Sequence, residues 1–191
     1  MTLGGMNLGS SSLPVAGQVL LGLLAGIAAV IDIRSRRIPN WLALAGIAAG
    51  LGWNAYFGGT RGLLHAALGL GTGFLLYFPL YLIRARGAGD VKLLTAVGAI
   101  CGPTDCFRVF LLTAIVGGAI VLVLVVLAGR LRRTFFNIGW ILYDLIRFRS
   151  PHRSNAEFDV TSDKGFRVPH AVMIAAGSAA FLFLTDYGSG R

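Results

Sequence analysis

The sequence predicts an all-α membrane protein with six transmembrane helices and with both termini on the extracytoplasmic side. The first observation is composition: 55% of the 191 residues are hydrophobic, only 13% are charged, and the mean hydropathy is +0.74. A soluble domain carries roughly 25% charged residues. The second observation is a series of apolar runs of membrane-spanning length. The third is that the basic residues gather in alternate loops between these runs. The length suits a single transmembrane domain covering 1–191.

Six apolar segments are expected to cross or enter the bilayer. They cover about 13–31, 41–57, 63–83, 88–101, 107–128 and 168–185. Most reach the roughly 17–25 residues that a membrane span requires. The fourth segment is short and begins with the glycine-rich stretch 87–89. Irregular backbone cannot face lipid, so this start is expected to be shielded by protein or to face water.

Positive charge sets the expected orientation. The loops that follow segments one, three and five hold 14 of the 17 Lys and Arg residues, whereas the opposite side has only Arg61, Arg108 and Arg191. Basic loops stay in the cytoplasm, so both termini are expected outside. The same pattern argues against nucleic acid as a partner, because the basic residues separate apolar runs instead of forming one basic surface. One missed or extra span would break this alternation.

The region of about 130–167 is expected to form a cytoplasmic loop. It contains the aromatic and basic stretch 135–148, which is too short to span a membrane and has arginines on both sides. Two interpretations are open: a helix lying in the membrane interface and a helix packed under the bundle. At the other end of the chain, residues 1–12 contain no basic residue, so a retained anchor is expected instead of a cleaved signal peptide.

The cysteines, histidines and glycines provide no pattern for a cofactor or a metal. Cys101 and Cys106 are the only cysteines, and the three histidines are scattered, whereas a structural zinc site needs about four ligands. The two cysteines form either a disulfide or ordinary apolar packing, and packing is favoured. The glycines of 69–73 are expected to permit close helix packing, since no phosphate-binding pattern accompanies them.

Two lone carboxylates are the strongest functional signal. Asp32 ends the first apolar segment and Asp90 starts the fourth, so the predicted topology places both at the cytoplasmic face. An acidic side chain near the membrane core is costly and marks function by default. Two carboxylates brought together can share a proton and activate water. The alternative for Asp32 is a solvated interface charge, and the alternative for Asp90 is a cap on its helix.

Residues beside Asp90 are expected to support it. Gly87 and Gly89 remove side-chain bulk, so that backbone or substrate can approach closely. Lys92 is either an ion-pair partner of Asp90 or a cation anchored at the interface, and the anchor is favoured. The remaining acids fall in predicted loops or in the interface segment and are given no chemistry: Asp105, Asp144, Glu157, Asp159, Asp163 and Asp186.

Three stretches resemble the type IV prepilin peptidase family. Residues 32–40, Asp-Ile-Arg-Ser-Arg-Arg-Ile-Pro-Asn, look like its first signature, and Gly87-Ala88-Gly89-Asp90 looks like its second, the GxGD motif. Residues 167–172 are similar to the opening of the last helix in the small members that serve tight-adherence pili. GxGD alone is a weak signal, but both signatures in order in a six-span chain are specific. The resemblance covers roughly 13–185.

The resemblance implies an aspartic endopeptidase of the inner membrane with Asp32 and Asp90 as its catalytic pair. The implied substrate is a prepilin, with a basic leader that is cut after a glycine and before a hydrophobic helix. Expected partners are this prepilin, membrane lipids and pilus assembly components. Pro39 would end the loop after Asp32, and Asn40 would cap the second segment. His170 lies in the third similar stretch and is either a hydrogen-bonding group near the site or a hydrogen-bonded interface histidine, and the second is favoured.

One departure and two rival functions accompany this interpretation. Larger relatives carry paired CxxC motifs and also methylate the new N-terminus, but Cys101 and Cys106 do not form such motifs, so methyltransferase activity is not expected. The first rival is another GxGD protease that cuts within the membrane, against which Ile38-Pro39-Asn40 argues. The second is a transporter or assembly subunit that is not an enzyme. A transporter would place its acids near the midplane.

Overall fold

The computed structural model describes residues 13–83, 87–127 and 170–188, apart from the side chains of 124, 125, 187 and 188. Every element in these ranges is a helix, so the all-α prediction is confirmed for them. The helices are α1 (Val15–Ser35), α2 (Asn40–Leu82), α3 (Ala88–Cys101), α4 (Pro103–Leu127) and α6 (His170–Gly188). The predicted interfacial helix at 135–148 and the first twelve residues lie outside the described ranges.

The chain divides into two compact units, one formed by Met1–Gly117 with Pro169–Arg191 and one by Gly118–Val168. Helix α4 passes from the first unit into the second. The contacts that build the candidate site all belong to the first unit.

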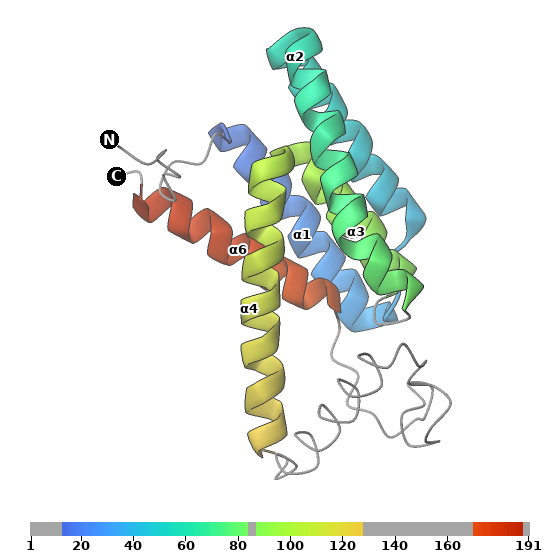
Figure 1. Ribbon diagram of the computed structural model, residues 1–191, viewed down its shortest axis with the longest axis vertical. Helices are drawn as coiled ribbons and strands as arrows, with labels where there is room; N and C mark the ends of the chain where they lie inside the picture. Colours follow the sequence, from blue (N-terminus) through green and yellow to red (C-terminus); the bar gives the residue numbers. More distant parts are fainter. Residues whose placement is uncertain (1–12, 84–86, 128–169, 189–191) are drawn as a thin grey trace, which may run out of the picture. The chain divides into compact units, whose positions relative to one another are not determined.

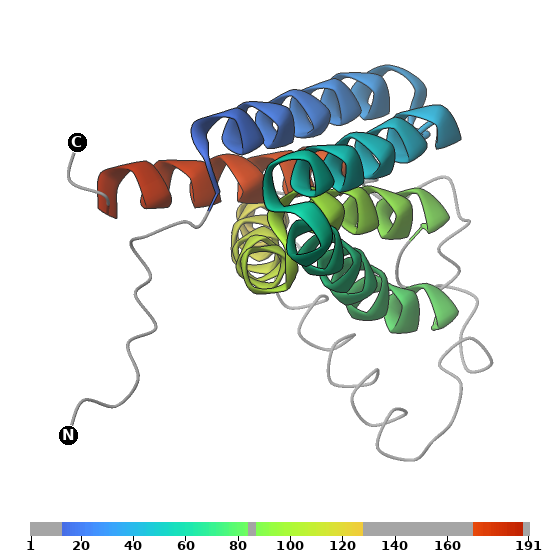
Figure 2. The same ribbon diagram turned by 90° about the horizontal axis from the view of Figure 1, so that it is seen from above.

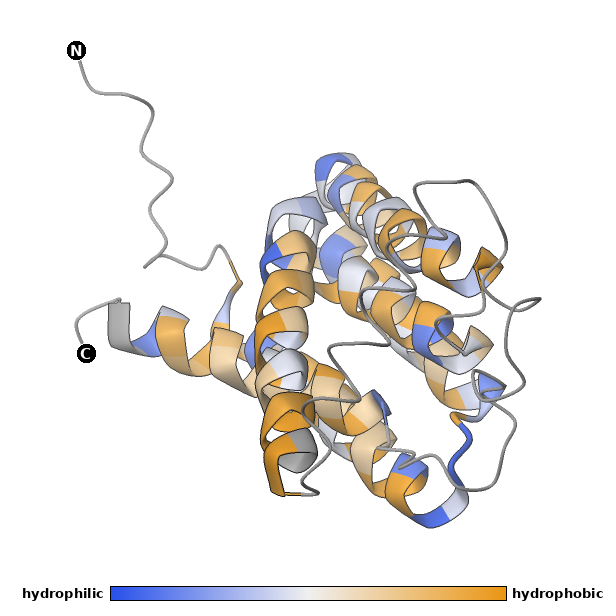
Figure 3. Cartoon of the chain, turned by 60° about the horizontal axis from the view of Figure 1, so that its bottom comes forward, coloured by the Kyte–Doolittle hydropathy of each residue, from blue (hydrophilic) through white to orange (hydrophobic). Residues whose placement is uncertain are grey.

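Three of the described helices are long and apolar enough to cross a membrane: α1, α2 and the first 21 residues of α4. Their outer faces carry large exposed apolar side chains, such as Val19, Leu23 and Val30 on α1. A soluble monomer rarely exposes so much contiguous apolar surface, so the chain is a membrane protein. Figure 3 shows hydrophobic residues along most of each helix and a hydrophilic connection between α1 and α2.

Helix α2 combines the second and third predicted segments. It has 43 residues, but Gly59 has φ 56° and ψ −141°, which is not a helical conformation. A positive φ is readily adopted by glycine, which has no Cβ. The break divides α2 into arms of 40–58 and 60–82, close to the predicted segments 41–57 and 63–83. Figures 1 and 2 show the chain reversing direction between the two arms.

The two arms of α2 pack on opposite sides of α3 through glycines. On the first arm, an added Cβ would lie 3.1 Å from the Ala96 Cβ at Gly46 and 2.7 Å from the Ala99 carbonyl carbon at Gly50. On the second arm, a Cβ at Gly69 would meet the Gly98 oxygen, and one at Gly73 would meet the Leu94 oxygen. Positions on the first arm therefore rise with those on α3, and positions on the second arm fall, so the arms are antiparallel.

Helix α3 is the centre of this unit. From Asp90 to Cys101 every side chain except that of Lys92 is buried. Its 14 residues extend about 21 Å, less than the roughly 30 Å of a hydrocarbon core. The prediction that this short segment needs protein around it therefore agrees with its burial. Asn54 of α2 donates hydrogen bonds to the Ala99 and Ile100 carbonyls, both at 3.2 Å, and so satisfies acceptors at the end of α3.

The turn between α3 and α4 differs from the predicted loop. Helix α4 begins at Pro103, four residues before the predicted 107, so Asp105 lies in its first turn. Asp105 is 1% exposed and pairs with Arg108 at 2.9 Å. Proline suits a first helical position because its missing N–H needs no partner there. Asp186, also expected in a loop, lies in α6, which extends past the predicted 185.

The cysteines and His65 have packing roles. Cys101 and Cys106 are free and buried, and Cys106 Sγ lies 4.0 Å from the Leu94 oxygen. The packing interpretation is therefore confirmed over a disulfide. His65, in the second arm of α2, lies against Gly102. Gly102 itself has φ 79°, so the turn from α3 into α4 depends on a glycine.

Candidate functional site

The candidate site lies where four helix ends meet. The C-terminal end of α1 and the starts of α2, α3 and α6 lie at the same end of the first unit (Figures 1 and 2). Asp32 belongs to α1 and Asp90 to α3, and each side chain is only 7% exposed. Asp32 is therefore not the solvated interface charge that composition alone allows. The connection from Arg36 to Pro39 links the first aspartate to the start of α2.

Asp32 is held by a helix that lies far away in sequence. Its Oδ2 accepts a hydrogen bond of 2.9 Å from the backbone N–H of Ala171, the second residue of α6. The backbone oxygen of Asp32 accepts a second hydrogen bond, of 2.8 Å, from the N–H of Arg36. Arg36 has φ 51° and is the left-handed residue that ends α1. Asp32 is thus fixed through both its side chain and its backbone.

Asp90 lies in the first turn of α3, as predicted. Gly87 occupies the N-cap position, and its carbonyl accepts the N–H of Asp90 at 3.1 Å. A Cβ at Gly87 would lie 3.8 Å from Asp90 Oδ2, which is an ordinary contact. The carboxylate therefore lies back over the start of its own helix, where the positive end of the helix dipole stabilises negative charge.

The first and second stretches that resemble the family, residues 32–40 and 87–90, pack directly on each other. Ile38, from the connection after α1, lies against Gly89, where an added Cβ would be 3.2 Å from the Ile38 Cβ. Lys92 is exposed, and its Nζ donates a hydrogen bond of 2.9 Å to Asn40 Oδ1. The group that approaches Gly89 closely is the Ile38 side chain, whereas the sequence suggested backbone or substrate.

The expected role of Asn40 needs correction. Asn40 does not cap α2: the N-cap position is Pro39, with φ −65° and ψ 142°, and Asn40 is the first helical residue. The Asn40 side-chain oxygen instead accepts the hydrogen bond from Lys92 Nζ. Lys92 in turn has a partner that the sequence did not suggest, since neither an ion pair with Asp90 nor an interface anchor anticipates Asn40.

His170 opens α6, close to Asp32. Its Nδ1 lies 3.2 Å from Met173 Sδ, and the residue is partly buried. Sequence reasoning missed Ala171, its neighbour. A backbone N–H carries no side-chain signal, and the only indication was that Ala171 falls in the third similar stretch.

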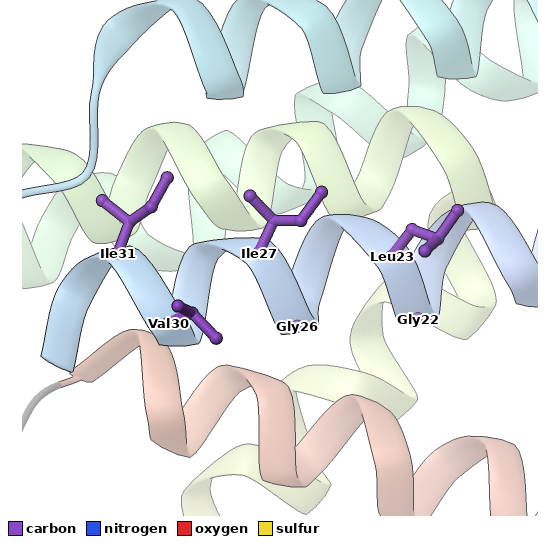
Figure 4. Close-up of a pocket in the computed structure, with 6 residues that line it drawn as sticks. All are labelled: Gly22, Leu23, Gly26, Ile27, Val30 and Ile31. Carbon is purple, nitrogen blue, oxygen red and sulfur yellow. The ribbon is translucent and has the colours of Figure 1, made fainter. Parts of the chain in front are cut away.

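A shallow apolar groove runs along α1 (Figure 4). Its volume is about 350 Å³, and the residues that line it are Gly22, Leu23, Gly26, Ile27, Val30 and Ile31. No polar side chain lines it, so it offers no chemistry of its own. Ile31, the last lining residue, precedes Asp32 in sequence, but Asp32 does not line the groove.

Gly87 and Gly89 are expected to differ in how well they tolerate substitution by alanine. Gly89→Ala should lower the free energy of unfolding by about 1 kcal/mol, because the new methyl group presses on Ile38. Gly87→Ala should leave it unchanged or raise it, because its methyl group would make only an ordinary contact. Thermal unfolding of the two purified variants in detergent measures the difference. Equal unfolding midpoints would show that the Ile38 side chain can move aside without a loss of stability.

The Lys92–Asn40 hydrogen bond is expected to couple the two stretches energetically. A double-mutant cycle with Lys92→Met and Asn40→Ala should give a coupling energy of about 0.5–1.5 kcal/mol in unfolding. Asn54→Ala supplies the control, because Asn54 donates hydrogen bonds to the opposite end of α3. Its effect on the free energy of unfolding should add to that of Lys92→Met. Additivity in both cycles would mean that the hydrogen bond does not link the stretches.

Comparison with known proteins gives the family of the chain. Residues 19–122 match the model of the type IV leader peptidase family, a range that includes both aspartates. A protein of Xanthomonas campestris pv. campestris, named prepilin leader peptidase/N-methyltransferase, is 32% identical over 133 residues. The match covers 64% of this chain and 45% of that relative, so the chain spans less than half of its length. No solved structure matches. On the family match, which takes in more than half of the sequence, the chain belongs to the type IV leader peptidase family.

Proposed function

We propose that this chain is a membrane-embedded aspartic endopeptidase that removes the leader peptide of prepilin-like substrates. The observation that carries the proposal is the direct packing of the two signature stretches, Ile38 on Gly89 and Asn40 on Lys92. This packing joins the segments that bear Asp32 and Asp90 at one end of the bundle. Membership of the leader peptidase family and the name of the Xanthomonas relative support the same reaction.

The proposed chemistry uses the two carboxyl groups with one proton between them. One carboxylate removes a proton from water while the water oxygen attacks the scissile carbonyl carbon. The other carboxyl group donates its proton to the carbonyl oxygen, so a tetrahedral diol forms. The diol then collapses, the C–N bond breaks, and the leaving amine takes up a proton. The products are the free leader and the mature N-terminus.

The position of both acids favours an enzyme over a transporter. Asp32 lies three residues before the end of α1, and Asp90 is the third residue of α3. A proton or cation pathway would place its acids near the midplane of the membrane. Acids at the helix ends instead suit a substrate whose leader lies outside the membrane and whose apolar helix lies within it.

The finer parts of the proposal concern topology and substrate. We propose six spans, in which the two arms of α2 count separately and the short α3 is enclosed by its neighbours. The excess of basic residues in alternate loops supports the site at the cytoplasmic face of the inner membrane, with both termini outside. The substrate is a prepilin of the tight-adherence type, with lipids and pilus assembly components as further partners. The proposal covers peptidase activity alone, because Cys101 and Cys106 are buried and packed.

Co-expression with a candidate prepilin tests the proposal. The wild-type chain is expected to convert the prepilin to its shorter mature form, detected by gel mobility and by mass spectrometry of the new N-terminus. Asp32→Ala and Asp90→Ala should each leave the precursor intact while accumulating in the membrane at wild-type levels. Mature pilin from both variants would refute the aspartic peptidase.

A further inference from the structure

The hydrogen bond between Ala171 and Asp32 joins two residues that are 139 positions apart. Ala171 is fully buried, and Asp32 is 7% exposed. A buried backbone N–H without a partner costs about 1–3 kcal/mol, so this donor and this acceptor depend on each other. Helix α6 lies beyond residues 19–122, which match the family model, yet it reaches one of the two proposed catalytic carboxyl groups.

The start of α6 is suited to hold a carboxylate. The first four N–H groups of a helix have no partner within the helix, and the helix dipole adds favourable interaction with negative charge. The two helices also pack along their length. A Cβ at Gly22 would lie 3.9 Å from Leu182, while Asp32 contacts Ala171. Residue numbers rise on α1 as they fall on α6, so the two helices are antiparallel. Their packing fixes the position of the Ala171 N–H along α1.

We propose that Ala171 is a positioning residue whose backbone N–H orients Asp32 for the reaction. The inference rests on the peptidase function proposed above. With Oδ2 engaged by the amide, the carboxyl group keeps one orientation, and Oδ1 is the oxygen that exchanges a proton with water. The last described helix of the chain is therefore part of the active site through its backbone.

Removing the amide hydrogen tests the proposal. Ala171→Pro deletes the N–H within the first helical turn, where proline is tolerated. We expect kcat for cleavage of a prepilin peptide to fall between about tenfold and a hundredfold, as misplaced catalytic groups typically cause. KM should stay the same, and the pH–rate profile should move, because the deleted amide contacts an ionisable group.

Val172→Pro serves as the matched control, because it places the same ring one residue later and deletes a neighbouring first-turn N–H. It should retain the wild-type pH–rate profile and most of kcat. Equal losses in the two proline variants with an unchanged profile, or full activity in Ala171→Pro, would overturn the proposal.

Hydrogen exchange separates this inference from the peptidase function. In the full-length protein, Asp32→Ala should accelerate amide exchange at Ala171, whereas Asp186→Ala, at the exposed end of α6, should not. Unchanged exchange at Ala171 in Asp32→Ala overturns the inference even if the wild type cleaves prepilin. Accelerated exchange together with no cleavage by the wild type would instead refute the peptidase function and, with it, the catalytic role of the amide.

Discussion

Asp32→Asn and Asp90→Asn are each expected to lower kcat for prepilin cleavage by about 10²–10⁴-fold, the usual contribution of an acid or base group. Asparagine has nearly the same shape as aspartic acid but neither takes up nor donates the required proton. In Asp32→Asn the side-chain oxygen still accepts the Ala171 N–H, so the helix contact persists and KM should change little. Single-turnover cleavage of a synthetic prepilin by the purified protein in lipid nanodiscs measures these rates.

Two further measurements make this prediction specific. The double variant should be no slower than the slower single variant, because groups that act as one unit are not additive. Asp186→Asn, at an exposed position of α6, should stay within about twofold of the wild type, as a charge remote from the site contributes nothing to proton transfer. A tenth or more of wild-type activity in Asp32→Asn would exclude a proton-transfer role for Asp32.

Gly69→Ala is expected to destabilise the protein by about 1–3 kcal/mol, the usual cost of overpacking. The added methyl group would meet the backbone oxygen of Gly98 on α3 and the Cα of Gly102 at 2.6 Å. Backbone atoms cannot rotate away as a side chain does, so α2 and α3 must separate. Because α3 carries Asp90, the same change should also reduce activity. The midpoint of thermal unfolding, followed by tryptophan fluorescence in detergent, measures the effect.

Gly71→Ala is the matched control on the same helix. A Cβ at Gly71 has nothing within 4 Å, so this variant should be more stable than the wild type by up to about 1 kcal/mol, the ordinary gain when alanine replaces a helical glycine. The two substitutions are two residues apart and have opposite expected signs. Unfolding midpoints that shift in the same direction would contradict the close contact between α2 and α3.

Much of this architecture was predictable because its signals are local. Apolar length and the glycines at 87 and 102 predict α3 at 88–101, the range that the structure has. The same reasoning predicted glycine-mediated packing at 69–73, but sequence spacing alone does not show that Gly69 and Gly73 face α3 while Gly71 faces away. Asp105 was assigned to a loop because it lies between two apolar segments, whereas its pairing with the partly exposed Arg108 lets the buried carboxylate lie in the first turn of α4.

The sequence by itself determined that this is a helical membrane protein and which two carboxylates stand out, because apolar length, charge bias and short motifs are properties of neighbouring residues. Tertiary structure alone decided which groups surround those carboxylates. Lys92 donates a hydrogen bond to Asn40, a partner that the sequence did not suggest, and a backbone amide of α6 holds Asp32. These two contacts join residues that are separated in sequence by 52 and by 139 positions. They depend on how helices pack, and a backbone N–H is the same in every residue except proline.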